Sequence, residues 1–236
     1  MSTAVDYSPD YDPESDFDHH YTRATAERIA EVIAPADRVL ELGCATGAMG
    51  AQLVAVGAHV VGVDRSSAYL RRADARGLRD ARYLRADLDV DAWDGEVGGP
   101  FDHVLVCNLL HEVADPVVLL ERAGALLAPG GRLHLTLQNP HSIHRLVALE
   151  MGIIADLRDV SERGRRYGTR GLWDADELIA MAGRAGLSVR ERGGVMLKPL
   201  PNRAMADLPG DVLDGFTRAA RHLPGNCAMT YLVLGR

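Results

Sequence analysis

The sequence predicts an α/β fold in which a doubly wound, mostly parallel β-sheet forms a single domain over residues 1–236. Three observations support this prediction. Short apolar segments alternate with segments of helical periodicity, and the turns between them are short. The first apolar segment ends in a glycine-rich turn at residues 43–50, and the second ends in an acid, Asp64, roughly 20 residues further on. The length suits one such domain with a full hydrophobic core.

The expected elements begin with a helix over residues 23–33, whose apolar positions have helical spacing and which ends before Pro35. Strands are expected over residues 39–42, 59–63, 81–84, 102–107, 131–137, 187–196 and 228–234. The helices between and after them are expected near 46–56, 67–76, 116–128, 141–152, 174–185 and 210–222. Regular alternation with short connections indicates parallel neighbouring strands.

The glycine-rich turn after the first strand predicts a nucleotide-binding loop. Its backbone N–H groups and the following helix start can approach a ligand closely, because Gly43 and Gly47 carry no Cβ atom. Asp64 stands where a nucleotide-binding βαβ unit has its ribose-binding acid. A dinucleotide fingerprint would have glycine in place of Ala45 and a neutral strand in place of the one that carries Glu41. A turn that only packs the helix on the strand is the alternative interpretation.

Further motifs follow the later strands. The segment 85–88 places an acid, Asp87, directly after the third strand, so acids follow two successive strands. Ligand binding explains this repetition, whereas folding alone does not. The segment 101–113 indicates a strand that opens into a loop with Asn108 and His111, and a Pro129-Gly130-Gly131 turn precedes the next strand.

Together these motifs resemble the class I S-adenosylmethionine-dependent methyltransferases over residues 25–140. Glu41, Gly43, Ala45 and Gly47 stand at the positions of that family's Glu-x-Gly-x-Gly-x-Gly loop, where Ala45 departs from the commonest residue. The resemblance implies a Rossmann-like doubly wound sheet of seven strands, mostly parallel with an antiparallel last strand. It also implies S-adenosyl-L-methionine as the cofactor.

The resemblance further implies which residues hold the cofactor. A carboxylate such as that of Asp64 offers two acceptor oxygens and can bind both ribose hydroxyls, while Asp87 and Leu88 would meet the adenine. The full expected set is Tyr21, Arg23, Glu41, Gly43, Cys44, Ala45, Gly47, Asp64, Arg65, Ser66, Asp87, Leu88, Asn108 and Leu109.

Histidine is the natural base for an acceptor hydroxyl or amine, because its pKa lies near working pH. His111 and His144 are the predicted catalytic residues, and each also has a purely structural interpretation as a capping or packing histidine. The 139–145 segment resembles a subset of bacterial small-molecule methyltransferases. Thr169 replaces a histidine of that subset, which indicates a different acceptor. The expected substrate-binding residues are His141, Arg145, Arg170 and Trp173.

No metal site is expected, because the adjacent side chains of His111 and Glu112 would point apart on a helix. Three regions are expected on the substrate side of the domain: a lid or cap at 1–34, and insertions at 158–173 and 199–224. The acidic start of the first region has two interpretations, a mobile tail or a segment that folds over the site.

Composition limits the class of partner and the location. The formal charge is -7, from 26 Lys+Arg against 33 Asp+Glu, which argues against nucleic acid as substrate. Arginines 163, 165, 166 and 170 nevertheless leave room for an anionic small molecule. The three cysteines form no Cys-x-x-Cys pair, and no apolar run reaches the roughly 20 residues of a membrane span. We therefore expect a soluble, cytoplasmic protein, monomeric or homodimeric, with no membrane partner.

The sequence thus predicts an S-adenosylmethionine-dependent methyltransferase that modifies an O or N atom of a small molecule, in secondary or specialised metabolism. Three alternatives remain open at this point. They are a peptide-directed methyltransferase, a NAD(P)-dependent Rossmann oxidoreductase and a non-catalytic cofactor-binding protein.

Overall fold

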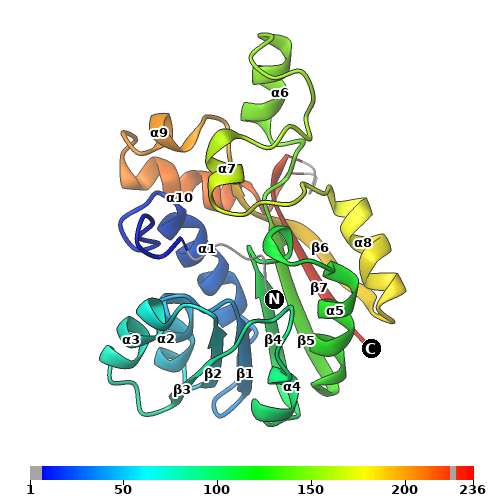
Figure 1. Ribbon diagram of the computed structural model, residues 1–236. Coiled ribbons are helices and arrows are strands. Elements are labelled where there is room, and N and C mark those ends of the chain that lie inside the picture. Colours follow the sequence, from blue (N-terminus) through cyan, green and yellow to red (C-terminus); the bar gives the residue numbers. More distant parts are fainter. Residues whose placement is uncertain (1–6, 224–226) are drawn as a thin grey trace.

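The computed structural model describes residues 7–223 and 227–236, which form a seven-stranded sheet with helices on both faces (Figure 1). The sheet order is β3-β2-β1-β4-β5-β7-β6, and β7 runs antiparallel to both of its neighbours. This confirms the predicted fold class, including the antiparallel last strand. The strands are β1 (Arg38–Leu42), β2 (His59–Asp64), β3 (Ala81–Arg85), β4 (Phe101–Cys107), β5 (Leu127–Leu137), β6 (Ser188–Leu197) and β7 (Ala228–Gly235).

Helices cover the two faces of the sheet and bury two separate apolar clusters. The helices are α1 (Asp18–Ala30), α2 (Ala48–Ala55), α3 (Ser67–Ala75), α4 (Trp93–Glu96), α5 (Pro116–Ala125), α6 (Ile143–Glu150), α7 (Glu162–Arg166), α8 (Ala175–Arg184), α9 (Asn202–Met205) and α10 (Gly210–Ala219), with a 3-10 turn, η1 (Leu110–Glu112). Side chains of α1, α2 and α10 form one cluster, and those of α4, α5 and α8 contribute to the other. Burial on both faces explains the continuous apolar runs of the central strands.

Several boundaries differ from the predicted ones. α1 begins at Asp18, not at residue 23, because Phe17 and Tyr21 are buried and draw the first turn into the core. β5 begins at Leu127, which pairs with Phe101 ahead of an irregularity in the ladder. The short elements α4, α7, α9 and η1 were not predicted, because three to five residues carry too little periodicity.

The carboxyl ends of β1, β2, β4 and β5 meet at one edge of the sheet, since these strands are parallel. Figure 1 shows α6 and α7 beyond this edge and α9 and α10 beside it. The predicted substrate-side insertions therefore contribute α7, α9 and α10 near that edge. Residues 1–6 of the acidic segment and residue 224 of the second insertion lie outside the described residues. In the described part of the chain, no helix has the length and apolar character needed to cross a membrane.

A chain of buried polar side chains crosses the sheet. Nδ1 of His134 lies 2.8 Å from the Tyr231 hydroxyl, and its Nε2 lies 2.9 Å from Nδ1 of His103. Nε2 of His103 lies 3.2 Å from the Asp37 carboxylate. Every contact is satisfied when each ring is neutral and carries its proton on Nε2, so that Tyr231 donates to His134 and His103 donates to Asp37. Burial lowers the pKa of His103 and lowers that of His134 to about 3.

This chain predicts destabilisation by mild acid. The unfolded chain takes up protons near pH 6.5, where the folded histidines do not. The contribution of these histidines to stability is therefore complete above that pH and falls as the pH drops below it, by about 1.4 kcal/mol per pH unit for each histidine that stays neutral in the folded state. Urea unfolding at pH 7, 6 and 5 measures this slope. Replacing His134 with Gln should reduce it, whereas the exposed His222→Gln control should not; an unchanged slope in His134→Gln would contradict this account.

Candidate active site

Two adjoining cavities open at the carboxyl edge of the sheet. The larger has a volume of about 1220 Å³ and is lined by the loops after β1, β4 and β5, by the N-terminal segment and by residues of α6 and α7. The smaller, about 100 Å³, lies at the ends of β2 and β3. Both are lined by Tyr7, Tyr11, Gly43, Ala45, Asn108 and Glu112. These shared walls make the two cavities parts of one site.

The glycine-rich loop forms the floor between the two cavities. Gly43 and Gly47 have φ values of 73° and 70°, in the left-handed region that glycine adopts without strain. Ala45 has φ 44° and Asn108, across the site, has φ 50°. Non-glycine residues adopt such values at a cost of order 1–3 kcal/mol, and they cluster at functional sites. Two of the three non-glycine residues with positive φ in the described part of the chain thus lie in the predicted site loops; the third, Ala36, lies ahead of β1.

Asp64 connects the loop after β1 to the end of β2. Its Oδ2 accepts a hydrogen bond from the Ala45 N–H at 2.9 Å, and its Oδ1 accepts one from the Ser66 N–H at 2.8 Å. The carboxylate also lines the smaller cavity. Asp64 therefore holds the loop in place through hydrogen bonds and is also a candidate to bind a ligand in the cavity.

The smaller cavity combines apolar and acidic walls. Ala86, Leu88, Leu109 and Val113 supply apolar surface, and Asp64, Asp87 and Asp89 supply carboxylates. Oδ1 of Asp87 accepts the Asp89 N–H at 3.0 Å. Apolar walls with acceptors at the edge suit a flat base attached to a sugar.

Buried polar atoms without partners face the larger cavity. Among the described residues, Oε2 of Glu41 and Oδ1 of Asn108 are buried and have no hydrogen-bond partner. Burial raises the pKa of Glu41 to about 8. Buried polar atoms are almost always satisfied in folded proteins. The unsatisfied atoms therefore fit a site shaped for a polar ligand, as expected for the amino-acid end of S-adenosylmethionine.

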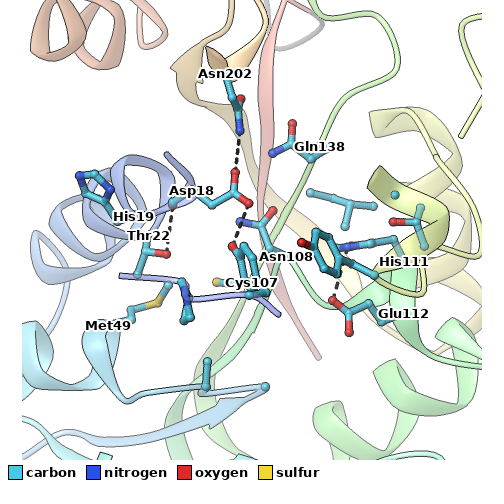
Figure 2. Close-up of a pocket in the computed structure, with 18 of the residues that line it drawn as sticks. Asp18, His19, Thr22, Met49, Cys107, Asn108, His111, Glu112, Gln138 and Asn202 are labelled. Atoms are coloured by element: carbon cyan, nitrogen blue, oxygen red, sulfur yellow. Dashed lines mark hydrogen bonds and ion pairs between the residues drawn. The ribbon is translucent and has the colours of Figure 1, made fainter. Parts of the chain in front are cut away.

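His111 and Glu112 lie opposite the α1 side of the cavity (Figure 2). Nε2 of His111 is 3.7 Å from Oε1 of Glu112, and its buried Nδ1 has no partner among the described residues. Burial lowers the pKa of His111 to about 4 and raises that of Glu112 to about 7. The Tyr7 hydroxyl donates to Glu112 at 2.8 Å, and Arg65 lies 3.6 Å from the same carboxylate. The site therefore contains a neutral imidazole, that of His111, with the carboxyl group of Glu112 beside it.

The N-terminal segment packs against α7. Nη2 of Arg163 lies 3.0 Å from Asp16 and 3.2 Å from Asp18, and Nη2 of Arg166 lies 3.0 Å from Asp10. The rings of Tyr7, Tyr11 and Tyr167 contact one another in the same region. The prediction that this arginine cluster is open to an anionic ligand is therefore wrong for Arg163 and Arg166, because acids of the same chain neutralise them.

Most of the predicted site residues lie in the cavity walls, and five do not. The walls contain Arg23, Glu41, Gly43, Cys44, Ala45, Asp64, Arg65, Ser66, Asp87, Leu88, Asn108, Leu109, His111, His144 and Arg145. The side chains outside the walls are accounted for by other contacts. Tyr21 is fully buried and bonds Asn202, and Gly47 lies beneath Tyr83. His141 lies 3.9 Å from Asp174, Arg170 bonds the Glu112 carbonyl, and Trp173 packs against the core.

Sequence reasoning missed several wall residues, namely Tyr7, Tyr11, Asp18, Gln138, Lys198 and Asn202. Tyr7 and Tyr11 lie in the acidic N-terminal segment, which matches none of the cofactor motifs. Lys198 could have been selected from the sequence, because it is the single lysine of the chain. Asn202 had no local signal, because its place beside Asp18 depends on α9 returning to α1.

Among the described residues, no group of three histidine, cysteine, aspartate or glutamate side chains is arranged to hold a metal ion. The partners of His111 and Glu112 are a tyrosine and an arginine, which do not complete a cation site.

Known proteins resemble this chain in sequence and in fold. The family model described as a methyltransferase domain matches residues 40–133. A ubiquinone biosynthesis O-methyltransferase of Xylella fastidiosa is 30% identical over 173 residues, covering 71% of this chain and 67% of the relative. One from Xanthomonas axonopodis is 28% identical over 191 residues, covering 79% and 77%.

Solved structures show the same fold. Magnesium protoporphyrin IX methyltransferase from Synechocystis, solved with bound S-adenosylhomocysteine, superimposes with a TM-score of 0.61 at 17% identity, covering all of this chain and 90% of that one. An S-adenosylmethionine-dependent methyltransferase from Mesorhizobium loti gives 0.58 at 17% identity, covering 95% of this chain and 100% of that one. This chain belongs to the class I S-adenosylmethionine-dependent methyltransferases, and S-adenosylmethionine is its cofactor.

Proposed function

We propose that this enzyme transfers the methyl group of S-adenosylmethionine to a hydroxyl oxygen of a small molecule. The observation that carries the proposal is the neutral imidazole of His111 in the cavity wall, whose Nδ1 has no partner among the described residues. The relatives named above are O-methyltransferases, which supports oxygen as the acceptor atom. Transfer to a hydroxyl requires removal of its proton, and His111 offers a free nitrogen for it.

The cofactor would be held by groups already described. Asp64 would accept from the ribose, Asp87 and Leu88 would meet the adenine, and Glu41 and Asn108 would bond the amino-acid end. When bound, the cofactor supplies an electrophilic methyl group on a sulfonium. The chain's own task is then to hold the acceptor in line and to take its proton.

His111 suits this task better than His144. The pKa of His111 lies near 4 because of burial, so the ring is neutral and able to accept a proton at neutral pH. Glu112, 3.7 Å away, would stabilise the imidazolium that forms. The pKa of His144 falls to about 3, because it is buried beside Lys198 and Arg145, and its Nδ1 already contacts the Ser142 hydroxyl at 3.0 Å. Neighbouring cations would oppose its protonation.

A product analysis tests the proposed reaction. The enzyme is incubated with S-adenosylmethionine and with matched pairs of phenols and anilines, and the methylated atom is identified by mass spectrometry and NMR. The proposal expects methyl ethers. N-methylated anilines without any methyl ether would refute it.

Four other properties expected from the sequence stay predictions. They are the cytoplasmic location, an acceptor from specialised metabolism, the monomeric or homodimeric state and the single-domain boundaries.

Asp64→Asn should weaken binding of S-adenosylhomocysteine by tenfold or more, about the contribution of one charged hydrogen bond. Asparagine keeps the size of the side chain but only one acceptor oxygen, so the loss reports on the missing charge together with one of the two bonds from the Ala45 and Ser66 N–H groups. Isothermal titration calorimetry measures the affinity. Asp207→Asn, at an exposed position, is the matched control. Undiminished affinity in Asp64→Asn would remove this residue from the cofactor site.

His111→Gln should lower kcat by about 10² or more, the usual contribution of a general base. The affinity for S-adenosylhomocysteine should stay within roughly twofold of the native value, as for substitutions that leave a binding site intact. Single-turnover kinetics with the best phenol from the panel provide the rate. The exposed His59→Gln variant controls for loss of a histidine in general. An unchanged kcat in His111→Gln would end its assignment as the base.

A further inference from the structure

Lys198 is an unusual cation in this protein. It is the single lysine among the 26 lysines and arginines of the chain, and it directly follows β6 in the wall of the larger cavity. Its backbone carbonyl accepts the His144 N–H at 3.2 Å, which fixes the start of α6 against it. Its Nζ lies 5.5 Å from the centre of the buried Tyr21 ring. The backbone of Lys198 is therefore fixed by the bond to α6, and its ammonium lies against the Tyr21 ring.

The described residues leave the Lys198 ammonium without an ion pair or hydrogen bond. Asp18 is the nearby carboxylate, but its oxygens are already bonded by Tyr11 at 2.9 Å, Asn202 at 2.9 Å and Arg163 at 3.2 Å. Burial lowers the pKa of Lys198 to about 8; the negative charges of Asp18 and Asp16 oppose this shift, and the positive charges of Arg163 and Arg145 add to it. A cation removed from water without a partner is costly unless a ligand supplies the counter-charge.

Other groups of the same wall can also donate hydrogen bonds. The side chain of Gln138 has no hydrogen-bond partner among the described residues, and Figure 2 shows it on the side of the opening where Asp18 and Asn202 meet. His144 remains neutral beside Lys198 and can donate one N–H. Arg145 bonds the carbonyls of Leu157 and Asp159, at 3.0 and 2.7 Å, and adds positive charge without a direct carboxylate partner. Donors and positive charge thus exceed acceptors here.

We propose that the acceptor of this methyltransferase carries an oxyanion, a carboxylate or a phosphate, and that Lys198 binds it with help from Gln138 and His144. The inference rests on the proposed function, because it describes the substrate of that same cavity. An ammonium suits this role, since it is a compact charge with three donors. Lys198 and His111 line the same cavity, so an acceptor anchored by its anion at Lys198 would lie in the cavity that His111 also lines.

The single lysine allows a direct test that does not depend on activity. Protein grown with lysine labelled with ¹³C at Cε gives one lysine signal, and its pH titration reports on Lys198 alone. The enzyme, loaded with S-adenosylhomocysteine, is titrated with benzoate, with phenyl phosphate and with neutral phenol as probes. The proposal expects benzoate or phenyl phosphate to move the signal and raise the lysine pKa, and phenol to leave both unchanged. The two anions distinguish a carboxylate site from a phosphate site.

Variants then test the role of the charge. Lys198→Met should weaken the binding of the preferred anion by roughly tenfold or more, the usual loss for a charged hydrogen bond. Lys198→Arg should retain most of the affinity. Arg79→Met removes the same charge from an exposed position outside the cavity walls and should change the affinity by less than roughly twofold. With 3,4-dihydroxybenzoate as acceptor, Lys198→Met should raise KM more than it lowers kcat, and with catechol it should change neither.

Specific results would overturn the inference. They are an unmoved lysine signal at millimolar concentrations of both anions, an equal response to phenol, or equal losses in Lys198→Met and Arg79→Met. Anion binding at Lys198 without any methyl transfer would refute the proposed function while supporting the anion site. Methyl transfer to 3,4-dihydroxybenzoate with the same KM in Lys198→Met as in the native enzyme would do the reverse.

Discussion

The parallel pairing of β1 with β2 and β4 is the constraint on which this site depends. Leu42 pairs with Val63 on one side and with Val106 on the other, so the three strands end in one row. The next residues of each strand are then forced together, and Gly43, Asp64 and Asn108 meet although they are far apart in the sequence. The bond from the Ala45 N–H to Asp64 closes this arrangement. The conformation of the loop after β1, the position of Asp64 and the shape of the cavity therefore depend on the pairing of these three strands.

The two ends of the cavity are polar in different ways. At the cofactor end, acceptor atoms prevail: the carboxylates of Asp64 and Asp87 and the unsatisfied oxygens of Glu41 and Asn108. At the Lys198 end, the buried ammonium shares the wall with the donors of Gln138 and His144. His111 also lies in the wall of the larger cavity and is kept neutral by burial. This difference suits methyl transfer from the cationic sulfonium of S-adenosylmethionine to a substrate that carries a negative charge.

Net charge is a poor guide to the local field of this protein. The formal charge of -7 resides partly in the N-terminal segment, where Asp10 and Asp16 neutralise arginines of α7. These ion pairs are exposed and individually weak, so the packing of Tyr7 and Tyr11 against Tyr167 is the more durable part of the contact. The acids of the N-terminal segment therefore organise one wall of the cavity.

The sequence by itself determined the fold class, the positions of nearly all strands and the cofactor loops. These features depend on local patterns: apolar runs, glycines at left-handed positions, and an acid directly after a strand. The tertiary structure alone decided which of the remaining polar residues share the cavity. His141 and Trp173 stood close to predicted site residues in the sequence yet lie outside the walls, whereas Tyr7, Asn202 and Lys198 enter from distant segments. Whether a side chain faces the cavity depends on how the irregular segments pack over the sheet edge, and that packing leaves no periodic signal in the chain.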